Sequence, residues 1–168
     1  YCRILRETGI EAVETECIEL VNPGGGYSLY LVQPRVPEEH LGNRRLAGES
    51  GADFDRLVQT TLAALAALWT RNSERAPAER IGIDGQISNW AYAKSGDGFR
   101  LSYFDVGTPF IRRDGKDQLD SEVHLKAMPF FLRPIVRVMF MKDVLDRYYD
   151  FRSVLIDFLA QSSRGIIR

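Results

Sequence analysis

The segment from Asp53 to about residue 70 carries the strongest periodic signal in the chain. Its apolar residues recur every three or four positions, which places them on one face of an α-helix. They are Phe54, Leu57, Val58, Leu62, Leu65, Leu68 and Trp69. Asp53 is the expected N-cap. Since burial of one large apolar side chain contributes about 1.5–3 kcal/mol, the fold has to enclose this helix as a central core element.

Antiparallel hairpins are predicted on both sides of this helix. Upstream, residues 11–21 alternate loosely, NPGGG supplies a turn, and YSLYLVQP follows as a second, more buried strand. Downstream, the run RIGI and a polar break lead to NWAYA and FRLSYFD, two short strands around a turn near Gly96 and Asp97. Each hairpin contributes local pairing that needs no distant partner.

Further helices are expected near both ends. Residues 1–9 resemble the last turns of a helix that stops at Gly9. Asp120 is placed to cap a helix over SEVHLKAM, and another helix is predicted from about Lys142 to Leu159. The order of hairpin, helix, hairpin and helices predicts an α+β fold without βαβ repeats.

Composition narrows the class of protein and its partners. The chain has 168 residues, 45% hydrophobic and 27% charged, which suits a globular domain with a sizeable core. A formal net charge of −1 predicts no general attraction to nucleic acid. Two cysteines without metal-type spacing favour a cytoplasmic setting. The most apolar stretch, from Met128, is interrupted by Arg133, Pro134 and Arg137, so no membrane span is expected. The sequence leaves the oligomeric state open.

Two polar breaks stand between these apolar strands, IDGQISNW at 83–90 and YFDVG at 103–107. Antiparallel pairing sets Asn89 opposite Phe104 or Asp105, because partners lie equally far from the turn. Asp84 can fold back to the same end of the hairpin. Two carboxylates and one amide suit Mg²⁺, which takes oxygen ligands. Asp and Asn are also favoured in turns, so an unrelated α+β domain with coincidental motifs remains an alternative.

The order of these motifs resembles the catalytic half of the kinase-like fold shared by protein kinases and aminoglycoside-type phosphotransferases. There, a catalytic-loop Asp is followed five residues later by a metal-binding Asn, then by a hairpin and an Asp-x-Gly motif. Asp84, Asn89 and Asp105-Val106-Gly107 match these positions. YSLYLVQPRVP resembles the last small-lobe strand and the hinge, and the 53–70 helix resembles the long helix before the catalytic loop. The chain also looks similar to uncharacterised bacterial proteins with a DGQxSNW signature.

This resemblance implies an ATP-dependent phosphotransferase that moves a γ-phosphate to a hydroxyl of an unknown acceptor. Asp84 would orient and deprotonate the hydroxyl, and Asn89 and Asp105 would hold Mg²⁺ against the nucleotide phosphates. The backbone near four hinge residues would receive the adenine: Leu31, Val32, Gln33 and Arg35. A small-molecule acceptor is favoured, because the segment from Asp105 to Asp120 is short for a peptide-binding loop.

The resemblance also implies two domains and a truncated chain. Residues 1–37 would be the remnant of a small lobe and hinge, and residues 38–168 the larger, mainly helical lobe. No glycine-rich phosphate loop followed by a strand lysine is present, so the phosphate-gripping strands are expected upstream of Tyr1 and little transfer activity is expected from this chain alone. Gly82 replaces the usual His, and Gln86 replaces a residue that is often cationic or an imidazole. These departures keep open a catalytically inert kinase-like binding or scaffold module.

Overall fold

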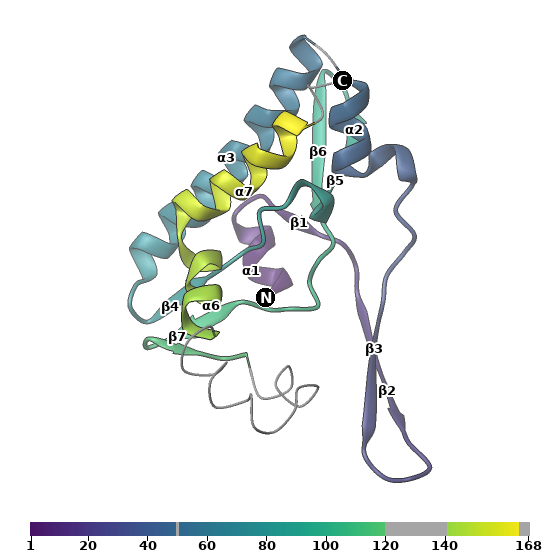
Figure 1. Cartoon of the computed structure of the whole chain (residues 1–168), viewed down its shortest axis with the longest axis vertical. Helices are drawn as coiled ribbons and strands as arrows, with labels where there is room; N and C mark the ends of the chain where they lie inside the picture. Colours follow the sequence, from purple (N-terminus) through teal and green to yellow (C-terminus); the bar gives the residue numbers. More distant parts are fainter. Residues whose placement is uncertain (50, 120–140, 165–168) are drawn as a thin grey trace.

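The computed structural model describes residues 1–49, 51–119 and 141–164, and this part of the chain has a mixed α+β architecture. It contains five α-helices and three small sheets (Figure 1). Within these residues, no helix is both long enough and apolar enough to cross a bilayer. The α+β class predicted from the sequence is therefore confirmed.

The long helix α3 (Ala52–Arg75) is the predicted central helix and extends beyond its expected end near residue 70. Leu57, Leu65 and Leu68 on its inner face are fully buried. The predicted cap is wrong: Gly51 occupies the N-cap position with a φ of 59°, and Asp53 lies in the first turn. There, the Asp53 carboxylate faces the positive end of the helix dipole and pairs with Lys94 at 3.1 Å.

A three-stranded sheet packs against α3 in the strand order β1-β6-β5. The predicted second hairpin is confirmed as β5 (Trp90–Ser95) and β6 (Gly98–Tyr103), turning at Gly96, whose φ is 56°. The strand predicted over residues 11–21 is divided: β1 (Glu11–Ala12) pairs in parallel with β6, and only the later part forms a hairpin. Helix α1 (Cys2–Glu7) precedes β1 and ends before Gly9, as predicted.

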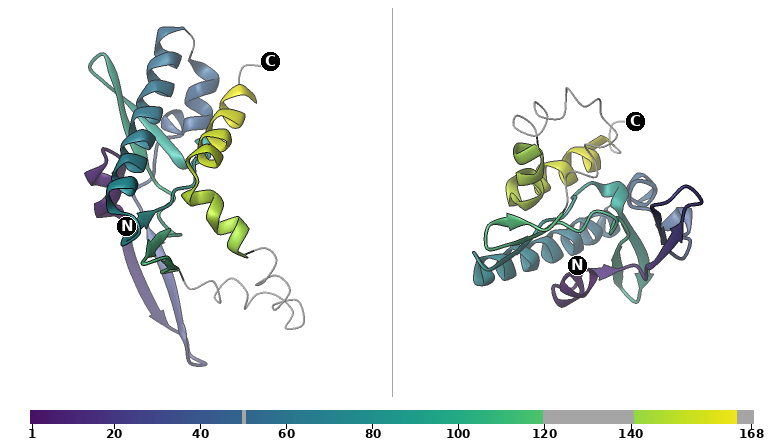
Figure 2. Two further views of the ribbon diagram at one scale, coloured as in Figure 1. Left: turned by 90° about the vertical axis from the view of Figure 1, so that its left-hand side faces the viewer. Right: turned by 90° about the horizontal axis from the view of Figure 1, so that it is seen from below.

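The first hairpin, β2 (Glu16–Val21) and β3 (Tyr27–Val32), projects away from the rest of the fold (Figures 1 and 2). Its pairing puts Ile18 opposite Tyr30 on one face and Cys17 opposite Leu31 on the other. The prediction of a buried second strand is wrong for the described residues, because Leu31 is 49% exposed and Tyr30 is 52% exposed. The apolar composition of the strand was predicted correctly, but most of both faces of the hairpin stays exposed in the described part of the chain.

The short elements after β3 and α3 lead toward the polar loop. A 3₁₀ turn (Glu38–His40) and α2 (Gly42–Gly48) connect the hairpin to α3. After α3, β4 (Glu79–Ile81) pairs with β7 (Ile111–Arg113), which pairs in turn with β8 (Lys116–Asp117). A second 3₁₀ turn (Ile87–Asn89) enters β5 directly. The polar loop thus runs from the end of β4 to the start of β5.

The C-terminal part forms two helices where the sequence predicted one from Lys142 to Leu159. Helix α6 (Met141–Tyr149) ends before Asp150, and α7 (Phe151–Arg164) begins after it. The Asp150 carboxylate accepts from the Ser153 N–H at 2.8 Å, which caps α7 and separates the two helices. Helix α7 lies along α3, where Phe151 contacts Trp69 (Figures 1 and 2). The helix predicted after Asp120 lies outside the described residues.

Candidate functional site

The polar loop is anchored at its start by a buried side chain from α3. Asn72, 2% exposed, donates through Nδ2 to Ile81 O at 2.7 Å and accepts through Oδ1 from Ile81 N–H at 2.9 Å. Both backbone groups of the last β4 residue are therefore satisfied by one amide. This fixes the chain direction three residues before Asp84.

Two glycines let the loop run in contact with other backbone segments. A Cβ at Gly82 would lie 2.9 Å from Tyr148 O, and one at Gly85 would lie 2.4 Å from Val154 O. Gly82 N–H also donates to Phe110 O at 2.9 Å. The His of the kinase pattern has no room at position 82, so this departure from the pattern has a packing cause.

Asp84 lies between these glycines, partly buried. Its Oδ1 accepts from the Gln86 N–H at 3.0 Å, which closes a local turn around Gly85. That single bond would serve a purely structural Asp equally well. A functional reading of Asp84 therefore depends on what else lies near its carboxylate.

The β5–β6 hairpin brings Asn89 beside the segment that carries Asp105. Phe104 N–H donates to Asn89 O at 3.1 Å, and Trp90 pairs with Tyr103 in the next register position. The predicted alignment of Asn89 with Phe104 is thus confirmed. Asp105 follows immediately, at the same end of the hairpin as Asn89.

Electrostatics connect Asp105 to Asp84. Burial first, and then the negative charge of Asp84, raise the pKa of the Asp105 carboxyl above its usual value. Both carboxylates therefore sit close enough in a partly desolvated environment for one to oppose ionisation of the other. Raised carboxyl pKa values of this origin occur often at functional sites and also in structural networks.

Two phenols that the sequence analysis missed, partly buried Tyr1 and buried Tyr103, lie near these carboxylates. Tyr1 donates its hydroxyl to Gly82 O at 3.0 Å. Tyr103 is fully buried, and its hydroxyl makes no hydrogen bond of ordinary geometry with the described residues, although the Tyr1 hydroxyl and the Asp84 backbone lie close to it. Burial raises the pKa of both phenols, and the charge of Asp105 raises both further. Only the position of Tyr103 two residues before Asp105 could have drawn attention to it.

The predicted adenine-binding residues behave differently from one another. Gln33 donates through Nε2 to Phe104 O at 2.8 Å and to Thr15 Oγ1 at 3.0 Å, so it joins the segment after β3 to the Asp105 segment. A Cβ at Gly107 would lie 3.2 Å from Leu31 Cδ1, which places Leu31 against Asp105-Val106-Gly107. The structure brings Leu31 and Gln33 to the carboxylate end of the β5–β6 hairpin.

Val32 and Arg35 do not share those contacts. Val32 lines a shallow pocket of about 270 Å³ together with Glu14, Glu16, Gln33 and Pro34. Arg35 is exposed on the segment that leads away from β3. Residues 31–33 therefore lie at the candidate site and its margin, whereas nothing in the described contacts ties Arg35 to the carboxylates.

The candidate site offers two carboxylates and one amide, Asp84, Asn89 and Asp105, of which Asn89 and Asp105 are the predicted metal ligands. Nowhere in residues 1–49, 51–119 and 141–164 do three His, Cys, Asp or Glu side chains gather as a metal site. Mg²⁺ is commonly bound through one or two carboxylates, with substrate phosphates and waters completing its six oxygens. The donor set thus suits a cation that arrives with a phosphate ligand better than a cation held by the protein alone.

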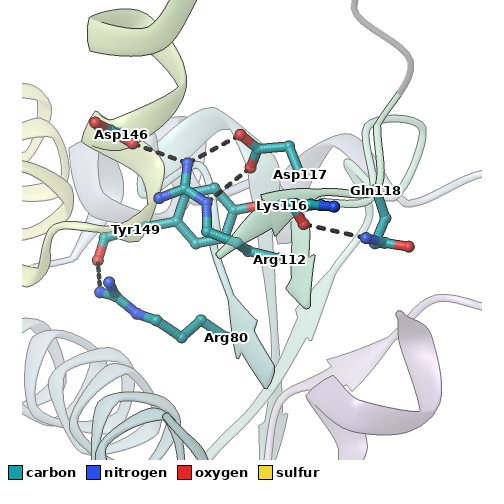
Figure 3. A network of polar contacts seen from close by, with 7 residues as sticks. All are labelled: Arg80, Arg112, Lys116, Asp117, Gln118, Asp146 and Tyr149. Atoms are coloured by element: carbon teal, nitrogen blue, oxygen red, sulfur yellow. Dashed lines mark hydrogen bonds and ion pairs between the residues drawn. The ribbon is translucent and has the colours of Figure 1, made fainter. Parts of the chain in front are cut away.

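An ion-pair network holds α6 against the sheet next to the loop (Figure 3). Arg112 on β7 makes two contacts of 3.0 Å with the Asp117 carboxylate and one of 2.8 Å with Asp146. Its guanidinium also stacks over the Tyr149 ring at 4.2 Å. Arg80 on β4 donates to Tyr149 O at 2.9 Å. These contacts position the end of α6, which touches Gly82 and Ile83.

A family model matches almost the whole sequence, residues 1–165, and its description is a family of unknown function, DUF6206. The chain belongs to the DUF6206 family. No curated protein and no solved structure matched the sequence. Membership in DUF6206 assigns no activity, so a function for this chain has to be argued from Asp84, Asn89, Asp105 and their surroundings.

Proposed function

We propose that the chain is part of a kinase-like, ATP-dependent phosphotransferase that uses Mg²⁺. The observation that carries the proposal is the hydrogen bond from Phe104 N–H to Asn89 O, which sets Asn89 beside Asp105 at the end of the β5–β6 hairpin, and the rise that the charge of Asp84 causes in the pKa of Asp105 supports it. The hinge contact from Gln33 to Phe104 supports it, because it brings the proposed adenine-binding segment to the same place.

In this proposal, Asn89 and Asp105 would hold Mg²⁺, which would offset the negative charge of the nucleotide phosphates, and Asp84 would face the acceptor hydroxyl. The acceptor oxygen forms a bond to the γ-phosphorus, and the bond from that phosphorus to the bridging oxygen breaks. ADP leaves, and the acceptor proton passes to Asp84. Catalysis of this type depends mainly on positioning and electrostatic stabilisation.

The exposed hairpin fits the small-lobe part of the proposal. A two-stranded hairpin is marginally stable alone, and strands that are apolar on both faces are typical of the inside of a larger sheet. Ile18 at 41% exposed and Leu29 at 67% exposed lie on opposite faces of the hairpin. We infer that this hairpin belongs to a small lobe in which additional strands bury it, whereas α1 and β1, which also fall within the predicted residues 1–37, share one core with α3 and β6.

The test is a calorimetric titration of the polypeptide, with any residues that precede Tyr1, against ATP with and without Mg²⁺. We expect Mg²⁺-dependent binding that Asp105→Asn abolishes. The matched control Asp97→Asn, an exposed carboxylate in the turn of the same hairpin, should leave the binding unchanged. Asp84→Ala should keep nucleotide binding and lower transfer by about 100- to 10,000-fold, the usual contribution of a general base.

A second candidate is a kinase-like module that binds nucleotide without transferring phosphate. Gln86 favours it, because a neutral amide stabilises developing phosphoryl charge less than a cation does. Binding by the wild-type protein without hydrolysis or transfer to any screened hydroxyl would favour this second candidate. Failure of a well-folded protein to bind ATP with Mg²⁺ would contradict both.

A further inference from the structure

The end of α6 lies in direct contact with the polar loop. Ile83 N–H donates to Tyr148 O at 3.0 Å, and the same oxygen lies 2.9 Å from the Cβ position of Gly82. Tyr148 also stacks on Phe110 with the ring centroids 4.2 Å apart. Because these contacts fix the backbone at Tyr148, the neighbouring Arg147 is held beside the residue that precedes Asp84.

Helix α7 approaches the other end of the same loop. The Val154 carbonyl lies 2.4 Å from the Cβ position of Gly85, the residue after Asp84. Asp157 follows three residues later on the same face of α7. Its carboxylate accepts from Arg147 Nη2 at 2.5 Å. The guanidinium is thus positioned by an ion pair between α6 and α7, with the loop against both helices.

The ion pair lies beside the loop at Asp84, because Arg147 adjoins the residue that contacts Ile83 and Asp157 lies one turn beyond the residue that contacts Gly85. The Asp157 hydrogen bond and charge raise the pKa of Arg147 most, and the charge of Asp84 raises it further. Asp84 likewise raises the pKa of the neighbouring Tyr148 phenol, after burial. The Arg147 side chain is 51% exposed, so its guanidinium remains accessible to a ligand.

A further cation would offset the negative charge that gathers when a triphosphate binds at a site of this composition. Asp84 and Asp105 repel a nucleotide's triphosphate, and one Mg²⁺ offsets only part of that repulsion. Kinase-like proteins often supply a further positive group two residues after the loop Asp, but this position is the neutral Gln86. An arginine fork suits phosphate oxygens, to which it can donate two parallel hydrogen bonds.

We propose that Arg147, oriented by Asp157, is the cation that contacts the terminal phosphate of a nucleoside triphosphate bound at Asp84 and Asp105. This assignment rests on the proposed function. It adds a residue from the C-terminal helices to a site whose other members come from the loop and the hairpin. It also gives the Arg147–Asp157 pair the role of orienting a ligand-binding group.

The test compares ATP with ADP, each with Mg²⁺, by calorimetric titration of the same polypeptide used for the proposed function. Arg147→Gln should weaken ATP binding by about tenfold to a hundredfold, the range for a hydrogen bond to a charged group, and ADP binding by less than about twofold. The ATP affinity of Arg147→Lys should lie between those of the wild type and Arg147→Gln. Arg152→Gln, an exposed arginine on α7, is the matched control and should leave both affinities unchanged.

Each outcome separates this inference from the proposed function. If the wild type prefers ATP and Arg147→Gln keeps the same ratio of ATP to ADP affinity, Arg147 does not contact the terminal phosphate. If the wild type binds both nucleotides equally, the inference also fails, although the nucleotide site stands. If the folded wild type binds neither nucleotide, both proposals are overturned. The thermal midpoint of each variant shows whether a lost affinity is a loss of folding.

Discussion

Asn72→Ala tests how firmly α3 fixes the loop that carries Asp84. It removes two hydrogen bonds, of 2.7 and 2.9 Å, and leaves the backbone N–H and C=O of fully buried Ile81 without them. A net hydrogen bond is worth about 0.5–1.5 kcal/mol, and a polar group left buried and unpaired costs about 1–3 kcal/mol. We therefore expect the free energy of unfolding to fall by about 3 kcal/mol.

That loss corresponds to a fall of about 6–12 °C in the thermal midpoint for a chain of this size. Urea unfolding followed by circular dichroism measures the free energy, and a thermal melt measures the midpoint. Asn72→Asp is an informative second variant, because its carboxylate still accepts from Ile81 N–H but cannot donate to the carbonyl. We expect it to be destabilised as well.

Gln59→Ala is the matched control, since this amide lies on the exposed face of the same helix. It should change the free energy of unfolding by no more than about 0.5 kcal/mol. A loss below about 1 kcal/mol for Asn72→Ala would refute the reasoning. It would mean that Ile81 finds other partners and that the loop is not anchored through α3.

Three further predictions concern the residues around the loop. Tyr103→Phe removes a buried hydroxyl that makes no hydrogen bond of ordinary geometry with the described residues. Calorimetry should therefore show a free energy of unfolding that is unchanged or higher by up to about 1 kcal/mol. A clear loss of stability would contradict this. Because the pKa of Asp105 is raised in the folded state, the protonated carboxyl stabilises the fold. This stabilisation is complete below the usual pKa of Asp and is lost as the pH rises through the pKa of Asp105 in the folded protein. Thermal melts across pH should therefore show a higher thermal midpoint for Asp105→Asn than for the wild type at pH 7, and the same midpoint for both proteins in acid. Equal midpoints at pH 7 would contradict this. Gly85→Ala puts a Cβ 2.4 Å from Val154 O and should cost about 1–3 kcal/mol in urea unfolding, whereas Gly48→Ala, with no atom within 4 Å, should cost none.

The elements that the sequence predicted well are those set by local spacing. The three- and four-residue recurrence from Phe54 to Trp69 identified α3, because one amphipathic helix carries that pattern by itself. The alignment of Asn89 with Phe104 followed from counting outward from the turn at Gly96. The proximity of Asp84 to this end of the hairpin was predicted separately, from its place five residues before Asn89 across the loop that contains Gly85.

Features that depend on distant partners were missed. Apolar residues in β3 suggested burial, but spacing alone does not say which surface covers a strand, and Leu31 and Tyr30 are exposed in the described structure. The break at Asp150 was missed because apolar periodicity continues on both sides of it. The two hydrogen bonds between Asn72 and Ile81 join α3 to β4. The relative position of these two elements is set by tertiary packing, so the sequence of neither segment predicts the contact.

One packing arrangement accounts for the glycine at position 82 and for the position of Arg147. The Tyr148 carbonyl lies 2.9 Å from the Cβ position of Gly82, which excludes the His of the kinase pattern, and it accepts from Ile83 N–H at 3.0 Å. The same contact sets the end of α6, which carries Arg147, against Ile83 in the loop. If Arg147 binds phosphate as proposed, Gly82 and Gln86 are consequences of a site completed by α6, and neither departure is evidence of lost activity.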